Sequence, residues 1–343
     1  MTRATTASSR NWNTPKISLF MGLILGILIL IACLVYSVTL GAVEIQLSTI
    51  LESFITFDGS YEHLVIQTVR LPRSLIAILV GSALAVAGAL MQGLTRNPLA
   101  DPGILGIESG AALAVVITIF VFGSSSLSVL TIVAFLGAGA TAILVYFLSS
   151  LGRGGATPLN LTIAGAALTA LISSLTTAIL IVSQRTLEEM RFWLAGSLAG
   201  RDFGILLQAL PFVTIGLVLA FALGRQITTM SLGEDVAKGL GQQTIGVKIT
   251  TAISIILLAG SSVSLAGPIG FIGLVVPHIV KFFIKADYRW ILPYSAVVGA
   301  SLLLVADVAA RILLKPQELP VGVMTALIGA PFFVYLAKSK VKK

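Results

Sequence analysis

The amino-acid sequence predicts an all-α membrane protein with about ten transmembrane helices. Of its 343 residues, 57% are hydrophobic and only 10% are charged, whereas soluble domains average about 25% charged residues. The mean hydropathy is +1.03, so the apolar side chains exceed what the core of a soluble protein could bury. These values exclude a soluble enzyme and a disordered chain. Because the apolar runs cover nearly the whole length, a protein with a single membrane anchor is excluded as well.

Ten apolar runs approach or exceed the roughly 20 residues that a helix needs to cross a bilayer. The first run follows a polar, basic segment (1–16) and lacks the small-residue cleavage site of a signal peptide, so it is expected to remain in the protein. Gly267, Pro268 and Pro277 interrupt the stretch 250–285, as in irregular helices that line a pathway. The predicted spans are Ile17–Tyr36, Ser74–Gly93, Gly103–Phe122, Leu127–Leu148, Leu161–Val182, Ile205–Leu223, Ile249–Leu265, Ile269–Phe283, Ile291–Leu313 and Val321–Leu336.

The net charge of +8 comes from 22 basic and 14 acidic residues, and its distribution predicts the topology. Ten alternating spans place most of the Lys and Arg residues on one side and most of the acidic residues between spans on the other. The positive-inside rule then assigns both termini to the cytoplasm, together with the tail 1–16 and the loop 225–248. The whole chain, 1–343, is expected to form a single transmembrane domain.

A weak internal repeat suggests that the domain has two halves. The segment Gly81-Ser-Ala-Leu-Ala-Val-Ala-Gly88 in the second span matches Gly260-Ser-Ser-Val-Ser-Leu-Ala-Gly267 in the seventh. With five spans in each half, the second half must be inverted in the membrane, which is a common plan for transporters. The alternative is a chance similarity between two helix faces rich in small residues.

The sequence contains no recognisable catalytic, metal or cofactor motif. It has only two histidines, His63 and His278, one cysteine, Cys33, and neither an H-E-x-x-H nor a Walker A pattern. Two acidic residues inside spans, Glu108 and Asp307, are functional candidates because charge is costly in lipid. Asp307 is expected to pair with Arg311 one turn later. For Glu108 a role in helix packing or pore lining is favoured over a proton site.

Three arginines lie on the predicted outer side, where positive charge brings no topological benefit. They are Arg70, Arg73 and Arg311. Two interpretations remain open. The arginines either pair internally, for example with Glu318 or Asp202, or form a docking site for an acidic partner, because a guanidinium can bind a carboxylate through two hydrogen bonds.

The loop 225–248 contains the signal of a short amphipathic helix. Ser231 followed by Glu234 has the spacing of a capping box, and two glycines end the helix. Such a helix either lies on the lipid surface or fits a groove on a cytoplasmic partner. Its apolar face consists of Leu232, Val236 and Leu240.

Several short motifs follow one another between residues 70 and 331. They are Arg70-Leu-Pro-Arg73, Arg96-Asn-Pro-Leu-Ala-Asp-Pro-Gly103, Leu232-Gly-Glu234, Leu240-Gly241, Gly267-Pro-Ile-Gly-Phe-Ile-Gly-Leu-Val-Val-Pro-His-Ile279, Glu318-Leu-Pro-Val-Gly322 and Gly329-Ala-Pro331. In their order and spacing the chain resembles the permease subunits of bacterial ABC importers for iron–siderophore complexes, haem and cobalamin. The motifs are specific for this family and say little about the substrate.

The resemblance implies roles for three groups of residues. In such permeases, arginines at the positions of Arg70, Arg73 and Arg311 receive glutamates of a substrate-binding protein. The segment that couples to the ATPase would comprise Leu232, Gly233, Glu234, Val236, Ala237, Leu240 and Gly241. The inner gate would lie at Pro158, Leu159 and Asn160.

The resemblance also implies the function: a non-enzymatic permease subunit that moves an iron(III)-siderophore-type chelate across the bacterial cytoplasmic membrane. The expected partners are a pair of ATPase subunits, a periplasmic or lipoprotein binding protein, a second permease copy or paralogue, and membrane lipid, with no nucleic acid and no cofactor. The alternatives are a haem or cobalamin importer permease and an ion-coupled secondary transporter. An intramembrane enzyme is disfavoured because the sequence offers no catalytic constellation.

Overall fold

The computed structural model describes residues 16–41, 45–123, 125–151, 157–284, 287–314 and 317–341. Throughout these ranges the regular structure is helical, and none of them contains a β-strand. The predicted all-α class is therefore confirmed. The predicted tail 1–16 lies outside the described residues except at its last position.

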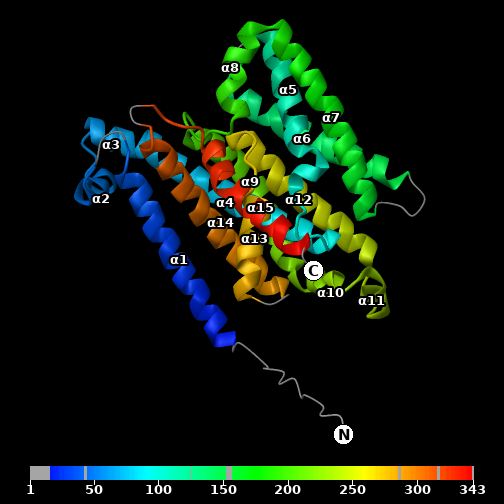
Figure 1. Ribbon diagram of the computed structural model, residues 1–343. Coiled ribbons are helices and arrows are strands. Elements are labelled where there is room, and N and C mark those ends of the chain that lie inside the picture. Colours follow the sequence, from blue (N-terminus) through cyan, green and yellow to red (C-terminus); the bar gives the residue numbers. More distant parts are fainter. Residues whose placement is uncertain are drawn as a thin grey trace.

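Ten apolar helices build the body of the molecule (Figure 1). Seven are long and apolar enough to cross a membrane, and three apolar helices are shorter. Together they correspond one to one with the ten predicted spans, so the chain is a multi-pass membrane protein. The long helices are α1 (Lys16–Thr39), α4 (Leu71–Thr95), α6 (Leu127–Ser150), α7 (Pro158–Val182), α9 (Phe203–Ala222), α12 (Thr244–Ala266) and α14 (Tyr288–Ile312). The shorter ones are α5 (Ile107–Phe122), α13 (Ile272–Phe283) and the apolar part, Val321–Val334, of α15 (Val321–Val341).

Short helices gather at the two ends of this bundle. In Figure 1, α10 and α11 lie toward one end, and α2, α3 and α8 lie toward the opposite end. The sequence analysis did not anticipate α2, α3 or α8, because they are too short and too polar to give a transmembrane signal. The short elements are α2 (Leu47–Ile55), α3 (Tyr61–Val65), the π-helix η1 (Ile66–Arg70), the 3₁₀-helix η2 (Pro102–Leu105), α8 (Gln184–Leu194), α10 (Gly224–Ser231) and α11 (Glu234–Gly239).

Two predicted spans begin later than expected because the chain first makes a non-helical turn. The span predicted from Gly103 begins as an α-helix only at Ile107, after the 3₁₀ turn of η2 and after Gly106, whose φ of 68° is left-handed. The span predicted from Ile269 begins at Ile272, because α12 ends at Gly267 with a φ of 71°. The break leaves α13 only 12 residues long.

Helix α4 is the centre of the fold, and glycines let its backbone approach two other helices closely. In its most apolar stretch 83% of the residues are buried, compared with 0% for α1. A Cβ atom on Gly81 would overlap the carbonyl group of Gly299 in α14, and one on Gly88 would overlap the backbone of Gly273 in α13. Close packing of small residues is the main way in which helices associate in lipid, where burial of apolar surface gives little driving force.

The helix contacts repeat between the two halves of the chain, as an inverted repeat requires. Helix α4 packs against α13 and α14, and α12, its counterpart, packs against α5 and α6. Likewise α5 contacts α6 as α13 contacts α14. The N-cap residues of α5 and α13, Gly106 and Phe271, are both left-handed. By these equivalences, helices α4 to α7 in the first half of the chain correspond, in order, to helices α12 to α15 in the second half.

The approach of α4 to α13 predicts a strong dependence on residue size. Gly88→Ala should destabilise the protein by about 1–3 kcal/mol, because the added methyl would meet backbone atoms that cannot rotate away. Gly246→Ala in α12 is the matched control, since nothing lies within 4 Å of the added methyl. It should be neutral or slightly stabilising because alanine favours helix. Thermal unfolding in detergent measures both, and equal melting temperatures would contradict the packing described above.

Candidate functional site

Three arginines and two acids form a cluster at the end of the bundle that carries α2 and α3. This outer cluster consists of Arg70, Arg73, Arg311, Asp307 and Glu318. Arg70 lies in the π-helix η1, which continues directly into α4. The three arginines are only 6–8% exposed. The structure thus brings together all three of the arginines that the sequence analysis singled out.

The carboxylate of Asp307 is the centre of the outer cluster and is fully buried. Arg73 donates from Nε to its Oδ1 atom over 3.0 Å, and Nε of Arg311 lies 3.2 Å from its Oδ2 atom. Arg73 also binds Glu318 at 2.7 Å. The predicted pairing of Asp307 with Arg311 is confirmed, as is the internal pairing with Glu318. Because 234 positions separate Arg73 from Asp307, no sequence pattern could have indicated their bond.

Two arginines of the outer cluster also bind the end of helix α1. Arg70 donates to the carbonyl oxygens of Val38 and Thr39, each over 2.8 Å. Arg311 donates to the carbonyl oxygens of Ser37, over 3.1 Å, and Leu40, over 2.8 Å. The last carbonyls of a helix have no partner within the helix, and cations at this end are favoured by the helix dipole. The arginines therefore attach α1 to α4 and α14.

The segment α10–α11 at the other end combines a buried face with an exposed apolar one. Its inward residues Ile227, Met230 and Ala237 are at most 3% exposed. The outward leucines Leu232 and Leu240 are 64% and 69% exposed. The segment is attached to α14, because the backbone N–H of Tyr288 donates to Thr228 Oγ1 over 2.9 Å. Val236, 47% exposed, adds to the apolar face.

Glu234 ties α11 to α12 instead of completing a capping box. The predicted box is wrong, because α11 begins at Glu234 with Gly233 as its N-cap, and Ser231 donates to the carbonyl of Thr228. The carboxylate of Glu234 binds Lys248 at 2.7 Å and Lys238 at 3.2 Å. The hydrogen bond with Lys248 lowers the pKa of Glu234 below its ordinary value of 4.5. The pairing therefore persists at neutral pH and is lost only as the pH falls through that lowered pKa.

The predicted inner gate forms the first turn of α7. Pro158 is the first residue of this helix, where its missing N–H is not needed. The hydroxyl of the N-cap Thr157 accepts a hydrogen bond from the N–H of Asn160 over 3.2 Å. Leu159 is 67% exposed. The turn is thus well capped and presents one apolar side chain outward.

Glu108 lies in the first turn of α5, where a negative charge is favoured by the helix dipole. It shares a small crevice with Asp101, next to the break between α12 and α13. The Oδ1 atom of Asp101 accepts a hydrogen bond from the N–H of Gly103 over 2.8 Å. The role of Glu108 in helix packing or pore lining remains a prediction.

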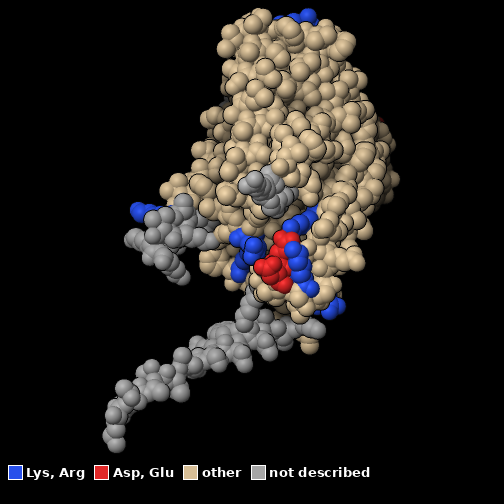
Figure 2. Space-filling model, turned by 90° about the vertical axis from the view of Figure 1, so that its right-hand side faces the viewer, with Lys and Arg blue, Asp and Glu red and all other residues tan. Residues whose placement is uncertain are grey.

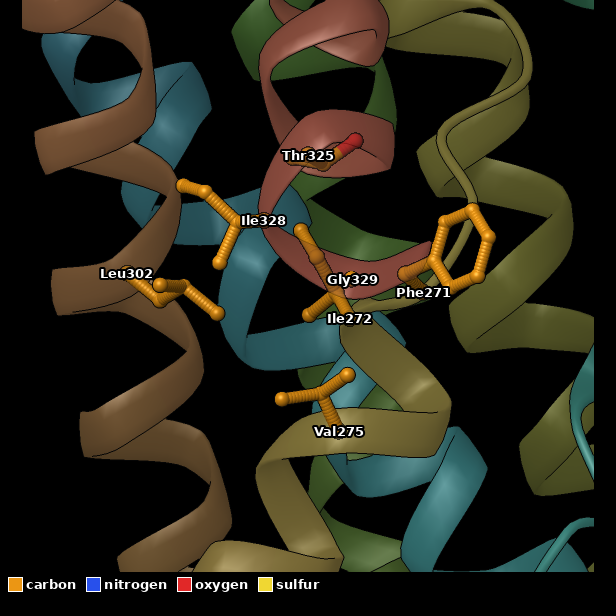
Figure 3. A pocket seen from close by; sticks show the side chains of 7 residues that line it. All are labelled: Phe271, Ile272, Val275, Leu302, Thr325, Ile328 and Gly329. Atoms are coloured by element: carbon orange, nitrogen blue, oxygen red, sulfur yellow. The ribbon is translucent and has the colours of Figure 1, made fainter. Parts of the chain in front are cut away.

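The break between α12 and α13 places a bulky residue in a conformation that favours glycine. Phe271 has a φ of 71°, which is sterically strained for a residue with a Cβ atom. Its side chain lies against Gly329 of α15, where any Cβ atom would overlap it. Figure 3 shows both residues beside an apolar space of about 10 Å³ that is bordered by α13, α14 and α15. The strained turn is therefore held in place by contact with α15.

Charged side chains are confined to the ends of the surface seen in Figure 2. Basic and acidic residues gather at its lower edge, near α10 and α11, and a wide area above them is almost free of charge. This distribution is the one that a helical bundle surrounded by lipid requires, because charges are costly inside the membrane.

Comparison with known proteins identifies the family. The model of the FecCD transport family matches residues 28–339. The chain belongs to this family. It is 48% identical to the probable siderophore transport system permease protein YfiZ of Bacillus subtilis (strain 168), over 92% of this chain and 95% of that protein. It is 39% identical to the hemin transport system permease protein HmuU of Yersinia pestis, over 93% of this chain and 95% of that protein.

The fold of this FecCD family member agrees with a solved structure. That structure, described as an inward-facing conformation of a metal-chelate type ABC transporter, superimposes with a TM-score of 0.83. The two chains are 32% identical, and the match covers 95% of this chain and all of the other. The resemblance expected from the sequence motifs is thereby confirmed at the level of family and fold.

The outer cluster predicts a large effect on stability when an arginine is removed. Arg311→Ala should lower the free energy of unfolding by roughly 3–5 kcal/mol, because it takes a guanidinium from the buried carboxylate of Asp307 and from the end of α1. Arg185→Ala is the control. Arg185 forms an ion pair with Glu189, but its side chain is 69% exposed, so its loss should cost at most about 1 kcal/mol. Similar melting temperatures for both variants would refute the internal role.

Proposed function

We propose that the chain is the transmembrane permease subunit of an ATP-driven importer for an iron(III)-siderophore-type chelate. The family match over residues 28–339 carries this proposal. Relatives named for siderophore and for iron(3+)-hydroxamate import, at 48% and 43% identity, favour the substrate class. The chelate is cargo, and the chain itself catalyses no reaction.

In a complete importer this chain would form one 343-residue transmembrane domain in the bacterial cytoplasmic membrane. A second permease copy or a paralogue forms the other half of the pore. Two separate ATPase subunits bind on the cytoplasmic side, where both termini and the loop 225–248 lie. A periplasmic or lipoprotein binding protein delivers the chelate to the opposite side.

The coupling segment would transmit movement from the ATPase to the membrane helices. It comprises Leu232, Gly233, Glu234, Val236, Ala237, Leu240 and Gly241. Its exposed leucines supply apolar anchors for an ATPase groove, and such anchors carry much of the affinity of an interface. The ion pair of Glu234 with Lys248 links the segment to α12, and the preceding helix α10 is linked to α14 by the hydrogen bond that Thr228 accepts from the N–H of Tyr288. Displacement of the segment would therefore move these helices.

The outer cluster would orient the binding protein over the pore. Three guanidinium groups and two carboxylates leave the cluster with an excess of one positive charge, which attracts acidic residues. The arginines also hold α1, so docking and internal pairing use the same side chains. At the opposite end Pro158, Leu159 and Asn160 would form the inner gate, with the exposed Leu159 closing the pathway.

A haem importer permease is the second candidate. The 39% identity to the hemin permease HmuU favours it, over almost the whole chain.

Transport in proteoliposomes tests the function. The permease, reconstituted with its genetically neighbouring ATPase and binding protein, should accumulate radiolabelled iron(III)-hydroxamate only when ATP is supplied on the ATPase side. Haemin presented in parallel should be carried more slowly. Uptake driven by a proton or sodium gradient without the ATPase would overturn the proposal, and faster uptake of haemin would favour the second candidate.

The coupling segment predicts a loss of ATPase binding when its apolar face is removed. Leu240→Ser should weaken capture of the ATPase by roughly 1–3 kcal/mol and abolish uptake, while the melting temperature stays unchanged because Leu240 is exposed. Leu313→Ser is the matched control, since Leu313 is 60% exposed at the opposite end. If the Leu240 variant captures the ATPase as well as wild type does, the coupling segment is not the ATPase-binding site.

The outer cluster predicts opposite effects of two charge changes on binding-protein association. Arg70→Glu should slow association, and the difference should shrink at high salt, because charges steer encounter. Glu318→Gln should speed association, because it removes a negative charge and so makes the cluster more positive. The side chain of Glu318 is 43% exposed, so this charge is accessible to a partner. Association rates at two salt concentrations, with melting temperatures, provide the measurement. If both variants associate at the wild-type rate, the arginines have only their internal role.

A further inference from the structure

An apolar cavity of about 200 Å³ lies between α4, α6, α7 and α12, next to η2. Its inner wall is buried, with Met91, Ala142 and Ile255 each at most 1% exposed. Its lining residues are hydrophobic throughout, from Met91 to Ile256, with Tyr146 as the one side chain that carries a hydroxyl. Apolar cavities of about 150 Å³ stay dry and bind molecules such as benzene. This cavity is therefore large enough for an apolar ligand and does not suit water.

The mouth of the cavity opens onto an exposed apolar surface of α6 and α12. Ile143 on α6 is 64% exposed, and Ile249 and Ile253 on α12 are each 46% exposed, although all three also line the cavity. The part of the chain that the structure describes therefore leaves these three isoleucines largely uncovered. Hydrocarbon is thus the medium that meets the mouth.

The position of the cavity along α12 corresponds to one leaflet of the bilayer. At a rise of about 1.5 Å per residue, Ile249 and Ile256 lie about 8 Å and about 18 Å from the start of α12 at Thr244. One leaflet contributes about 15 Å of hydrocarbon. The cavity therefore runs along the direction of the acyl chains. In the proposed topology, on which this step rests, the leaflet is the cytoplasmic one.

Basic side chains surround the end of α12 below the cavity. Lys238 and Lys248 share the carboxylate of Glu234. The Nη1 atom of Arg96 lies 3.6 Å from the position that a Cβ atom on Gly233 would occupy. Figure 2 shows basic and acidic side chains gathered at this end, below the uncharged surface. Since three cations meet Glu234 and Asp235 here, the local excess of charge is positive and attracts an anionic headgroup.

We propose that the cavity holds part of one acyl chain of an anionic phospholipid from the cytoplasmic leaflet, with its headgroup near Arg96, Lys238 and Lys248. The volume, the hydrophobic lining, the mouth on the lipid-facing surface and the basic residues at the level of the headgroups all favour this occupant. Leu161 of α7, next to the inner gate residues, is part of the cavity wall. The bound chain thereby contacts the helix that carries the proposed gate.

Lipid retention tests the proposal. The full-length chain is incorporated into nanodiscs that contain equal amounts of phosphatidylglycerol and phosphatidylcholine, both with the same acyl chains. It is then transferred into detergent, and the lipids that stay bound are identified by native mass spectrometry. Wild type should retain about one lipid per chain, mainly phosphatidylglycerol. Ala252→Phe, which fills the cavity, should reduce retention at least tenfold. Leu136→Phe is the control, because Leu136 is 62% exposed on α6 and does not line the cavity.

Four outcomes would overturn the proposal. The first three are the absence of a retained lipid in wild type, equal retention by the Ala252 and Leu136 variants, and no preference between the two headgroups. Loss of the lipid on assembly of the permease pair would overturn it as well, since the partner would then cover the mouth. Melting temperatures of the Ala252 and Leu136 variants close to that of wild type establish that both are folded.

Discussion

The close approach of helix α4 to its neighbours is the contact on which the rest of the structure depends. In lipid, helices gain little from burying apolar side chains, so backbone proximity and van der Waals contact must hold them together. Gly81 and Gly88 provide that proximity toward α14 and α13. Because α12 also packs on α4, the two halves of the chain meet there, and the broken segment before α13 is placed beside α4.

Around this apolar centre, two carboxylates near the ends of spans have partners of opposite sign: the buried Asp307 and the partly exposed Glu234. Asp307 is neutralised by two arginines from two helices, and Glu234 by two lysines. Removing a charged group from water is costly unless such a partner is present. The two ends of the bundle therefore combine structural ion pairs with the surfaces proposed for docking, and the membrane region between them remains apolar.

Composition and periodicity were sufficient to predict the number of spans, because lipid imposes a length and an apolar character that local sequence must satisfy. They could not place helix starts such as Ile107 and Ile272, which depend on left-handed turns at Gly106 and Phe271. The Asp307–Arg311 pair was predictable from helical spacing. The bond from Arg73 to Asp307 and the bonds from Arg70 to α1 were not, since they join distant segments. The capping box at Ser231 failed because tertiary bonds to Lys248 decide the position of Glu234.

The attachment of α1 has a consequence for the order in which the protein matures. The carbonyl groups at the end of α1 are bound by Arg70 and Arg311, yet Arg311 is synthesised some hundreds of residues after α1. During synthesis the carbonyls of Ser37 and Leu40, which Arg311 binds, must remain solvated by water at the membrane surface while the intervening helices insert. Only when α14 has entered the bilayer can its arginine replace that water. The first helix to be made is therefore among the last to reach its final bonds.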